Sequence, residues 1–376
     1  MIQTGQAGID IKGMNRKKIY EFLREARSVS KQDIVYALKL SLPTVTQNLQ
    51  EFQEKGLVDT TGRIGHTGGR NATAFSFISD ARVAIGIDIQ KHHNTVVIVD
   101  LDGRVIEKIR KPVHFATTDE YYKMLGAEVA EILEKAKIDP AKVLGVGMGV
   151  PGLISKDGKE VVYGRILNFT GETSENFSRY IPFRTLLFND ANAAGSAEMW
   201  SSHNIRNAFY ICLSDHIGGA VILDNKVYEG DDQRSGEIGH MTVVADGRPC
   251  YCGQYGCFET YCCASLLSEA AGGDLDSFFG KLEAGDKRIT ELWNSYLHYL
   301  AFAVHNIRML FDCNVILGGY VGAYIDKYME PLYEMVRQRD MFSEEPGAYL
   351  LPCRYKTEAI AAGAALPFVE EFFHGI

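Results

Sequence analysis

The clearest chemical group in the chain is one imidazole and three thiols within eighteen residues. These residues are His240, Cys250, Cys252 and Cys257. Structural zinc takes four such ligands in a closed tetrahedron, so the pattern favours a structural Zn²⁺ site, with unrelated reduced cysteines as the alternative. The other five cysteines lie in apolar stretches and are expected to be core residues: Cys212, Cys262, Cys263, Cys313 and Cys353.

A second group combines carboxylates with an amide. Asn189 and Asp190 end an apolar strand at 186–188 and open the helix that follows. In α/β proteins such a strand end points into the crevice where ligands bind. Glu237 and Glu259 lie on either side of the cysteine loop. Held together, these side chains suit the hydroxyl groups of a sugar, although each alone is more typical of a solvated surface charge.

The length and charge distribution of the chain indicate two or three domains of different charge. The 376 residues are 46% hydrophobic and 23% charged, which suits a globular protein of two or three domains. We see no secretory signal and no uncharged stretch long enough for a membrane span, so we expect a cytoplasmic protein with no membrane insertion. Residues 1–80 hold 11 Lys/Arg and 8 Asp/Glu, so +3 there and −12 elsewhere make up the total of −9. A basic module on an acidic body is typical of a protein in which one domain touches phosphates.

Three helical patterns in the first eighty residues predict a helix-turn-helix. Asn15 is expected to cap the first helix, and Ser30 with Asp33 the second. A third helix begins near Ser41 and turns its apolar residues inward. Its polar outer face carries Thr44, Gln47, Asn48 and Gln50. Such side chains can read adenine and thymine in the major groove.

A glycine-rich hairpin is predicted next. The segment Gly56-Leu57-Val58-Asp59, a glycine-rich loop with basic residues over 62–70 and a returning strand over 72–77 are typical of a wing. Its tip could place Arg63, His66 or Arg70 against DNA. We therefore expect a winged helix-turn-helix over residues 1–80. Its expected DNA contacts are Ser41, Thr44, Gln47, Asn48, Arg63 and Arg70. The alternative is a small helical bundle with a solvated polar face.

The remaining chain shows an α/β pattern that occurs twice. Strands at 83–89, 95–100 and 104–109 have counterparts at 209–213, 219–223 and 226–228. Two such halves indicate a duplicated, two-lobed architecture with a cleft between the lobes. We expect one lobe to comprise residues 81–200 with 358–376, and the other residues 201–357 with a zinc loop at 237–260.

The motifs of the body resemble those of the ROK family of repressors and sugar kinases. The matching segments are Gly236-Glu237-Ile238-Gly239-His240, the cysteine loop from Cys250 to Glu259, Asn189-Asp190-Ala191-Asn192, Gly149-Val150-Pro151-Gly152 and Ile316-Leu317-Gly318-Gly319. The front resembles the winged helix of the repressor branch. The resemblance implies an actin-like, hexokinase-type fold and zinc ligands at His240, Cys250, Cys252 and Cys257. It also implies sugar contacts at Asn168, Asn189, Asp190, Glu237, His240 and Glu259, with Asp190 matching the family's catalytic base.

Two turns depart from the pattern of the family's kinases. Where those have Asp-x-Gly-Gly-Thr, this chain has Asp88-Ile89-Gln90-Lys91-His92, and the second turn reads Ser214-Asp215-His216. Bulky and acidic side chains stand where backbone amides should approach ATP phosphates. The sequence therefore predicts a protein that is not an enzyme but a sugar-responsive repressor of carbohydrate-metabolism genes.

The expected partners are operator DNA, a sugar or sugar phosphate effector, and further copies of the chain in a homodimer or a dimer of dimers. One alternative is an active ATP-dependent sugar kinase fused to a DNA-binding domain, which measurable ATP affinity would favour. Another is a regulator with a vestigial sugar site that answers to a protein partner.

Overall fold

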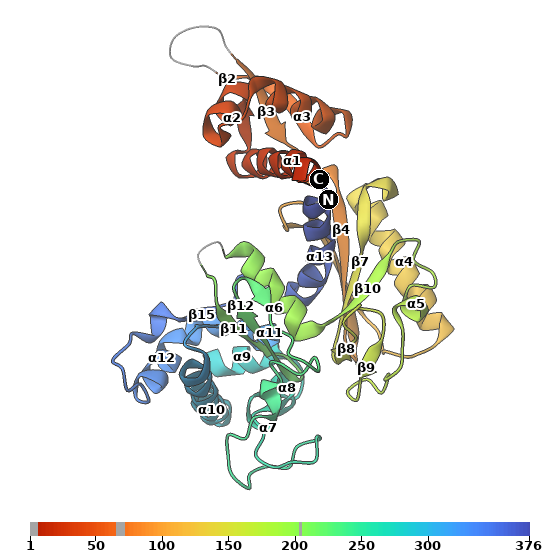
Figure 1. The fold of residues 1–376 in the computed structure, drawn as a ribbon. Helices are drawn as coiled ribbons and strands as arrows, with labels where there is room; N and C mark the ends of the chain where they lie inside the picture. The colour runs from red at the N-terminus through yellow and green to blue at the C-terminus, as the bar shows by residue number, and fades with distance from the viewer. Residues whose placement is uncertain (1–6, 65–71, 203–204) are drawn as a thin grey trace, which may run out of the picture.

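The computed structural model describes residues 7–64, 72–202 and 205–376 (Figure 1). Residues 7–77 of this part form a head, in which helices pack on a small sheet of order β1-β3-β2. Its elements are α1 (Ala7–Ala26), β1 (Ser28–Ser30), α2 (Lys31–Leu38), α3 (Leu42–Glu54), β2 (Val58–Ile64) and β3 (Ala72–Phe77). Figure 1 shows the head on top of the body, with α1 nearest to it.

Local sequence explains where the helices of the head begin. Ser30 and Asp33 form the predicted capping box at α2, with the Ser30 amide donating to the Asp33 carboxylate at 2.9 Å. The third helix begins near Ser41, as predicted, and the Ser41 hydroxyl caps it by accepting from the Thr44 amide. The predicted cap at Asn15 is wrong. Residues 7–14 contain no proline to interrupt a helix, and they already belong to α1, so Asn15 lies inside it.

The predicted wing hairpin is confirmed up to its tip. β2 and β3 pair antiparallel from Val58 opposite Phe77 to Ile64 opposite Ala72. The tip, with the predicted contacts His66 and Arg70, lies outside the described residues. Of Arg63 only the backbone, in β2, is described.

The body contains two lobes whose sheets have the same topology. In the orders β6-β5-β4-β7-β10 and β13-β12-β11-β14-β15, three antiparallel strands are followed by two parallel ones. The lobe 1 strands are β4 (Val83–Ile89), β5 (His93–Asp100), β6 (Val105–Pro112), β7 (Val143–Val150) and β10 (Thr185–Asn189), with a separate β8 (Leu153–Ile154) and β9 (Val161–Tyr163). The lobe 2 strands are β11 (Ala208–Leu213), β12 (Ile217–Leu223), β13 (Lys226–Val227), β14 (Asn314–Gly318) and β15 (Leu350–Pro352). The repeated order confirms the predicted duplication.

Two helices join the lobes. α6 (Asp190–Ser201) packs on β11 and β12, α13 (Ala359–Gly375) packs on β4 and β7, and the two helices lie against each other between the sheets (Figure 1). The approach is close: a Cβ on Gly363 would lie 1.7 Å from the Ala193 carbonyl oxygen. The remaining helices are α4 (Asp119–Ala136), α5 (Ser174–Phe177), α7 (Glu259–Cys262), α8 (Ala264–Ala271), α9 (Leu275–Glu283), α10 (Lys287–Phe311), α11 (Gly319–Gly322) and α12 (Met329–Arg337).

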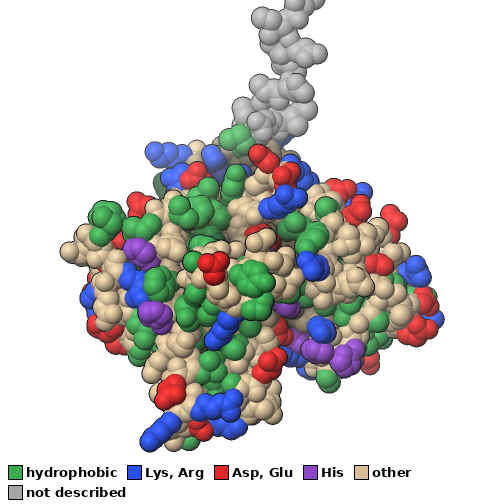
Figure 2. All heavy atoms as spheres, turned by 90° about the horizontal axis from the view of Figure 1, so that it is seen from below, with side chains coloured by type: hydrophobic (Ala, Val, Ile, Leu, Met, Phe, Trp, Pro, Cys, Tyr) green, Lys and Arg blue, Asp and Glu red, His purple; other side chains and the backbone are tan. Residues whose placement is uncertain are grey.

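Most charged side chains and the predicted core cysteines of the body lie where the composition predicts, at the surface and in the core respectively. Seen from below, acidic and basic side chains are interspersed over the face in view (Figure 2). Four of the predicted core cysteines are buried and Cys263 is half-buried. Within the described ranges, no helix is both long and apolar enough to cross a bilayer.

Candidate functional site

A cavity of about 450 Å³ lies between the lobes and contains most of the predicted sugar contacts. Lobe 1 contributes Asn189 and Asp190, and lobe 2 contributes Glu237 and His240. Residues far apart in the sequence thus meet in one cleft, as the strand-end argument predicts. Carboxylate oxygens accept hydrogen bonds from hydroxyls, and an imidazole can donate or accept one.

The start of α6 holds the lobe 1 side chains in place. Asn189 caps the helix through its side-chain oxygen, which accepts from the Asn192 amide at 2.9 Å, and its amide donates to the Gly152 carbonyl at 3.0 Å. One Asp190 oxygen accepts from the Ala191 amide at 2.8 Å. Burial raises the pKa of Asp190 to about 6, and the nearby Glu237 carboxylate adds to this effect. Asp190 is therefore largely ionised at pH 7 and able to accept a hydroxyl proton.

Two predicted sugar contacts do not line this cavity, and their expected roles need correction. Glu259 is buried, and its oxygens accept from the Ile217 amide at 2.6 Å and pair with His216 Nδ1 at 2.7 Å. It therefore supports the cavity wall from behind, because its hydrogen-bonding capacity is used by the 216–217 turn. Asn168 is exposed and lies outside the lining.

Other residues of the lining were missed by sequence reasoning. His216, read there only as an obstacle to phosphate, and Tyr251 both face the cavity. The Tyr251 ring lies 5.3 Å from the rings of His216 and His240, and its hydroxyl is 3.3 Å from His240 Nε2. Arg165 and Arg234 complete the rim. Among these residues only Tyr251 could have been predicted from the sequence, because it lies between two of the predicted zinc ligands. His216, Arg165 and Arg234 lie in segments without a motif that indicates ligand binding.

The predicted metal ligands come together at the edge of this cavity. The donor atoms of His240, Cys250, Cys252 and Cys257 all lie within 4.8 Å of one another. Cys250 Sγ is 3.8 Å from His240 Nδ1, and Cys252 Sγ is 3.7 Å from Cys257 Sγ. Zn–S bonds of about 2.3 Å in a tetrahedron require sulfurs about 3.8 Å apart, so the donors fit zinc. His240 turns Nδ1 to the thiols and Nε2 to the Tyr251 hydroxyl beside the cavity.

Loop geometry explains how a short segment gathers four donors. Thr242 and Cys257 form a β-bridge, which places Cys257 beside the chain that follows His240. The Cys250 amide donates to the Gln254 carbonyl at 2.8 Å and closes the tight loop around Cys252. Gly256 has φ +73°, and a Cβ there would lie 1.6 Å from the Val244 carbonyl oxygen, so only glycine fits.

The two altered phosphate turns also meet, in a neighbouring cavity of about 720 Å³. Gln90 and His92 from lobe 1 and Asp215 and His216 from lobe 2 all line it. Gln90 is only 8% exposed, and its side-chain amide donates to Asp88 at 2.7 Å. Bare backbone is therefore absent at the first turn, where the Gln90 side chain occupies the space beside the Asp88 carboxylate.

Asp88 lies fully buried in this region. Its second oxygen has no hydrogen-bond partner in the described part of the chain. Burial raises the pKa of Asp88 to about 7; Gln90 lowers it, while Asp190 raises it further. The Asp88 and Asp190 carboxyl groups thus both lie close to the Gln90 side-chain amide.

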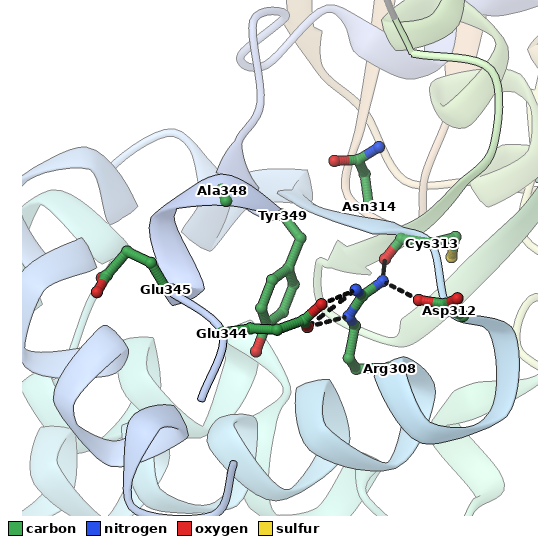
Figure 3. A pocket seen from close by; sticks show the side chains of 8 residues that line it. All are labelled: Arg308, Asp312, Cys313, Asn314, Glu344, Glu345, Ala348 and Tyr349. Carbon is green, nitrogen blue, oxygen red and sulfur yellow. Dashed lines mark hydrogen bonds and ion pairs between the residues drawn. The ribbon is translucent and has the colours of Figure 1, made fainter. Parts of the chain in front are cut away.

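A third cavity, of about 390 Å³, lies at the end of α10 (Figure 3). Arg308 pairs there with Glu344 at 2.8 Å and with Asp312 at 2.9 Å, and it stacks 4.6 Å from the Tyr349 ring. Because these charged groups satisfy one another, the arrangement is that of a structural ion-pair cluster rather than a ligand site.

Four of the predicted DNA contacts lie at the start of or on α3, and the exposure of one of them does not fit its expected role. Ser41 and Gln47 are exposed and Thr44 is half-buried. Asn48 is only 8% exposed, and its amide donates to the Thr44 carbonyl at 2.8 Å. The prediction that Asn48 reads DNA is therefore wrong, because its position on the helix turns it toward α1, where Arg16 contacts it at 3.4 Å.

Comparison with known proteins assigns the family. The profile of the ROK family matches residues 84–370. The chain belongs to the ROK family. A xylose repressor of Bacillus subtilis is 26% identical over 263 residues, 68% of this chain and 67% of its own length. A xylose repressor of Caldicellulosiruptor bescii is 22% identical over 377 residues, 94% of each chain, which puts this ROK chain in the repressor branch with its head included.

Solved structures confirm the predicted fold. A ROK family transcriptional regulator described as a homologue of the Escherichia coli MLC protein has a TM-score of 0.75 and 20% identity, covering 97% of each chain. A ROK glucokinase of Streptomyces griseus has a TM-score of 0.66 and 21% identity, covering 76% of this chain and 98% of its own. The hexokinase-type lobes are thus shared with kinases, and the amino-terminal head is shared with the regulator.

The buried Asp88 predicts an unusual dependence of stability on pH. In the folded protein the pKa of Asp88 is about 7, whereas in the unfolded chain this carboxyl group loses its proton near pH 4. The folded state therefore binds more protons between these pH values, and the contribution of Asp88 to the free energy of unfolding falls as the pH rises from 4 through 7. Asp88→Asn keeps an acceptor for Gln90 and removes the charge. We expect the variant to gain on the order of 2–4 kcal/mol in unfolding free energy at pH 8, and nothing near pH 4.

Urea unfolding of both proteins at the two pH values measures this gain. Glu291→Gln, on the exposed side of α10, is the matched control and should change stability little at either pH. A gain independent of pH, or an Asp88→Asn protein less stable than the parent at pH 8, would contradict the assignment.

Proposed function

We propose that the chain is a sugar-responsive transcriptional repressor of carbohydrate-metabolism genes whose ROK lobes bind a sugar without phosphorylating it. Residues 1–80 bind operator DNA. Residues 81–200 with 358–376 and residues 201–357 form the two lobes, whose closure on sugar weakens DNA binding. The chain acts as a homodimer or a dimer of dimers, because paired recognition helices read the two halves of an operator.

The Gln90–Asp88 hydrogen bond carries the proposal that the lobes do not catalyse. In phosphoryl transfer, backbone amides and a metal ion must approach the phosphates closely. The Gln90 side chain lies where that approach would occur, 2.7 Å from Asp88. The second turn adds Asp215 and His216 to the same cavity, and the Asp215 carboxylate would repel phosphate. The alternative, an active sugar kinase, requires all these side chains to move away.

The sugar site itself keeps its hydroxyl partners. Asn189, Asp190, Glu237 and His240 line the inter-lobe cavity. Relatives in the repressor branch are named as xylose and N-acetylglucosamine repressors, which supports a monosaccharide or its phosphate as the effector. We assign Glu259 a supporting role through His216.

Zinc is proposed as a structural cofactor held by the His240 and cysteine cluster. A closed four-ligand site leaves no position for a reacting water, so the ion would brace the loop rather than catalyse. His240 then fixes the loop with Nδ1 and presents Nε2 toward the cavity, which couples loop stability to sugar binding.

We expect one zinc per purified chain by elemental analysis. Cys252→Ser should lose the metal and, because metal binding contributes directly to folding of the loop, should also lower the melting temperature. Cys263→Ser is the matched control: it is a nearby half-buried cysteine outside the cluster and should retain zinc. An unchanged zinc content in Cys252→Ser would disprove the ligand assignment.

Operator recognition should depend on the exposed Gln47 near the middle of α3. Gln47→Ala should cost about 1–3 kcal/mol at the operator if the side chain reads a base, and little on unrelated DNA. Gln53→Ala, exposed near the end of the same helix, should leave affinity unchanged. Gel shifts with operator and scrambled DNA compare the proteins, and equal losses for both substitutions would exclude this reading face.

Sugar binding should depend on Asp190. We expect Asp190→Asn to weaken binding by on the order of 1.5–3 kcal/mol through loss of a charge-assisted hydrogen bond, while operator affinity without sugar stays nearly unchanged. Calorimetry with D-xylose, D-glucose, N-acetyl-D-glucosamine and their phosphates measures the effect. Binding of none of these compounds, or unaltered binding by Asp190→Asn, would refute the proposed site.

A further inference from the structure

The head is attached to the body by a charged cluster at the end of α6. Asp102, in the turn between β5 and β6, has a side chain only 5% exposed that pairs with Arg24 at 3.2 Å and with Arg27. The Trp200 indole nitrogen donates to the Asp102 carbonyl at 2.7 Å. The Arg24 guanidinium lies 4.9 Å from the Trp200 ring, close enough for a cation–π contact. Trp200 in α6 thus contacts both the lobe 1 turn and the head.

This attachment leads directly to the DNA-reading helix. Arg24 belongs to α1, four residues after Tyr20, which is fully buried. The Tyr20 ring packs on Phe52 of α3 at 5.0 Å and on Phe373 of α13 at 5.5 Å. Because packed interiors transmit small shifts, a displacement of α1 must also displace α3.

The opposite end of α6 lies in the sugar cavity. The helix begins at Asp190, which lines that cavity, and runs twelve residues to Ser201, roughly 18 Å. α13 also connects the body with the head, but none of its residues lines the 450 Å³ cavity in the described chain. α6 therefore joins a proposed sugar contact to a head contact within one rigid element, which α13 does not.

Lobe 2 acts on the same end of α6. The Glu198 carboxylate accepts from the Arg354 amide at 2.9 Å and from the Tyr355 amide at 2.8 Å. The Tyr355 hydroxyl then donates to the Gly103 carbonyl of the lobe 1 turn at 2.8 Å. Gly103 has φ +79°, and a Cβ there would lie 2.4 Å from the Trp200 indole nitrogen. Movement of lobe 2 relative to lobe 1 must therefore displace the turn that contains Asp102 and Gly103. Asp102 in this turn pairs with Arg24 of the head.

We propose that α6 transmits the sugar signal, and that the Trp200–Asp102–Arg24 cluster is the joint through which it repositions the DNA-binding head. The inference rests on the proposed function and specifies how the sugar site is regulated. Trp200 and Arg24 are positioning residues, since neither lines the proposed sugar cavity nor lies on α3. Weakening the joint should leave both binding events intact and remove the link between them.

The test compares operator affinity with and without saturating sugar in the full chain. D-xylose, D-glucose and N-acetyl-D-glucosamine are the probes, and the ratio of the two operator dissociation constants is the readout. Typical couplings give ratios of about 5–150. We expect Arg24→Ala and the milder Trp200→Phe to bring the ratio toward 1, with sugar affinity within about twofold of the parent. Arg206→Ala, which breaks the exposed Arg206–Asp224 pair near α6 without touching the head, is the matched control and should keep the parent ratio.

The outcomes separate this inference from the proposed function. Failure of all three sugars to release operator from the parent protein would count against the proposed function. Release that persists undiminished in Arg24→Ala and Trp200→Phe would overturn the inference alone. Loss of sugar binding in these variants would also overturn it, because the joint would then be part of the sugar site.

Trp200 fluorescence gives a readout that does not need a sugar. The chain has two tryptophans, so Trp293→Phe leaves Trp200 as the single reporter. If the joint links head and body, operator binding at the head should change the surroundings of the Trp200 ring and shift the Trp200 emission, because coupling between two sites acts in both directions. Arg24→Ala should abolish this shift. Emission unchanged by saturating operator would contradict the joint.

Discussion

Backbone contact between α6 and α13 holds the functional parts of this protein in one arrangement. Gly363 lets α13 approach the Ala193 carbonyl, and Gly86 and Gly147 let the same helix lie directly on the lobe 1 sheet. A side chain at any of these positions would force the helix away. From this contact α6 reaches from the sugar cavity to Trp200, and α13 reaches Tyr20 in the head. Cleft and head are thus parts of one packed structure.

In the proposed function the body keeps the hydroxyl-binding half of a kinase-like site and lacks the phosphate-binding half. Asp190 lines the inter-lobe cavity with Glu237 and His240, and together these side chains offer hydrogen-bond partners for hydroxyl groups. Asp88 instead accepts a hydrogen bond from the Gln90 side chain, which forms without any ligand. In the proposed function this side chain occupies the space where a phosphate would approach. Binding without turnover would suit the proposed regulator, because an effector that is not consumed can keep biasing the equilibrium between DNA-bound and free protein.

Short-range chemistry was predictable from the sequence, whereas contacts across lobes were not. The Ser30 capping box, the start of α3 near Ser41, the cysteine cluster and the strands of each half all follow from local sequence patterns. The burial of Asn48 depends on α1, and the side-chain bonds of Glu259 depend on His216, forty-three residues away. Trp200, Asp102 and Arg24 belong to no motif, so only the folded chain shows that they meet.

The central claim is that sugar releases this protein from DNA and is itself unchanged. One mixture tests it most directly: labelled operator, the full chain, Mg-ATP and either D-xylose, D-glucose or N-acetyl-D-glucosamine, with anisotropy and ADP followed together. We predict that at least one sugar lowers the anisotropy while ADP stays at background with all three. ADP formation at about 1–100 per second, the usual range of kinases, or unchanged anisotropy with every sugar, would contradict the account.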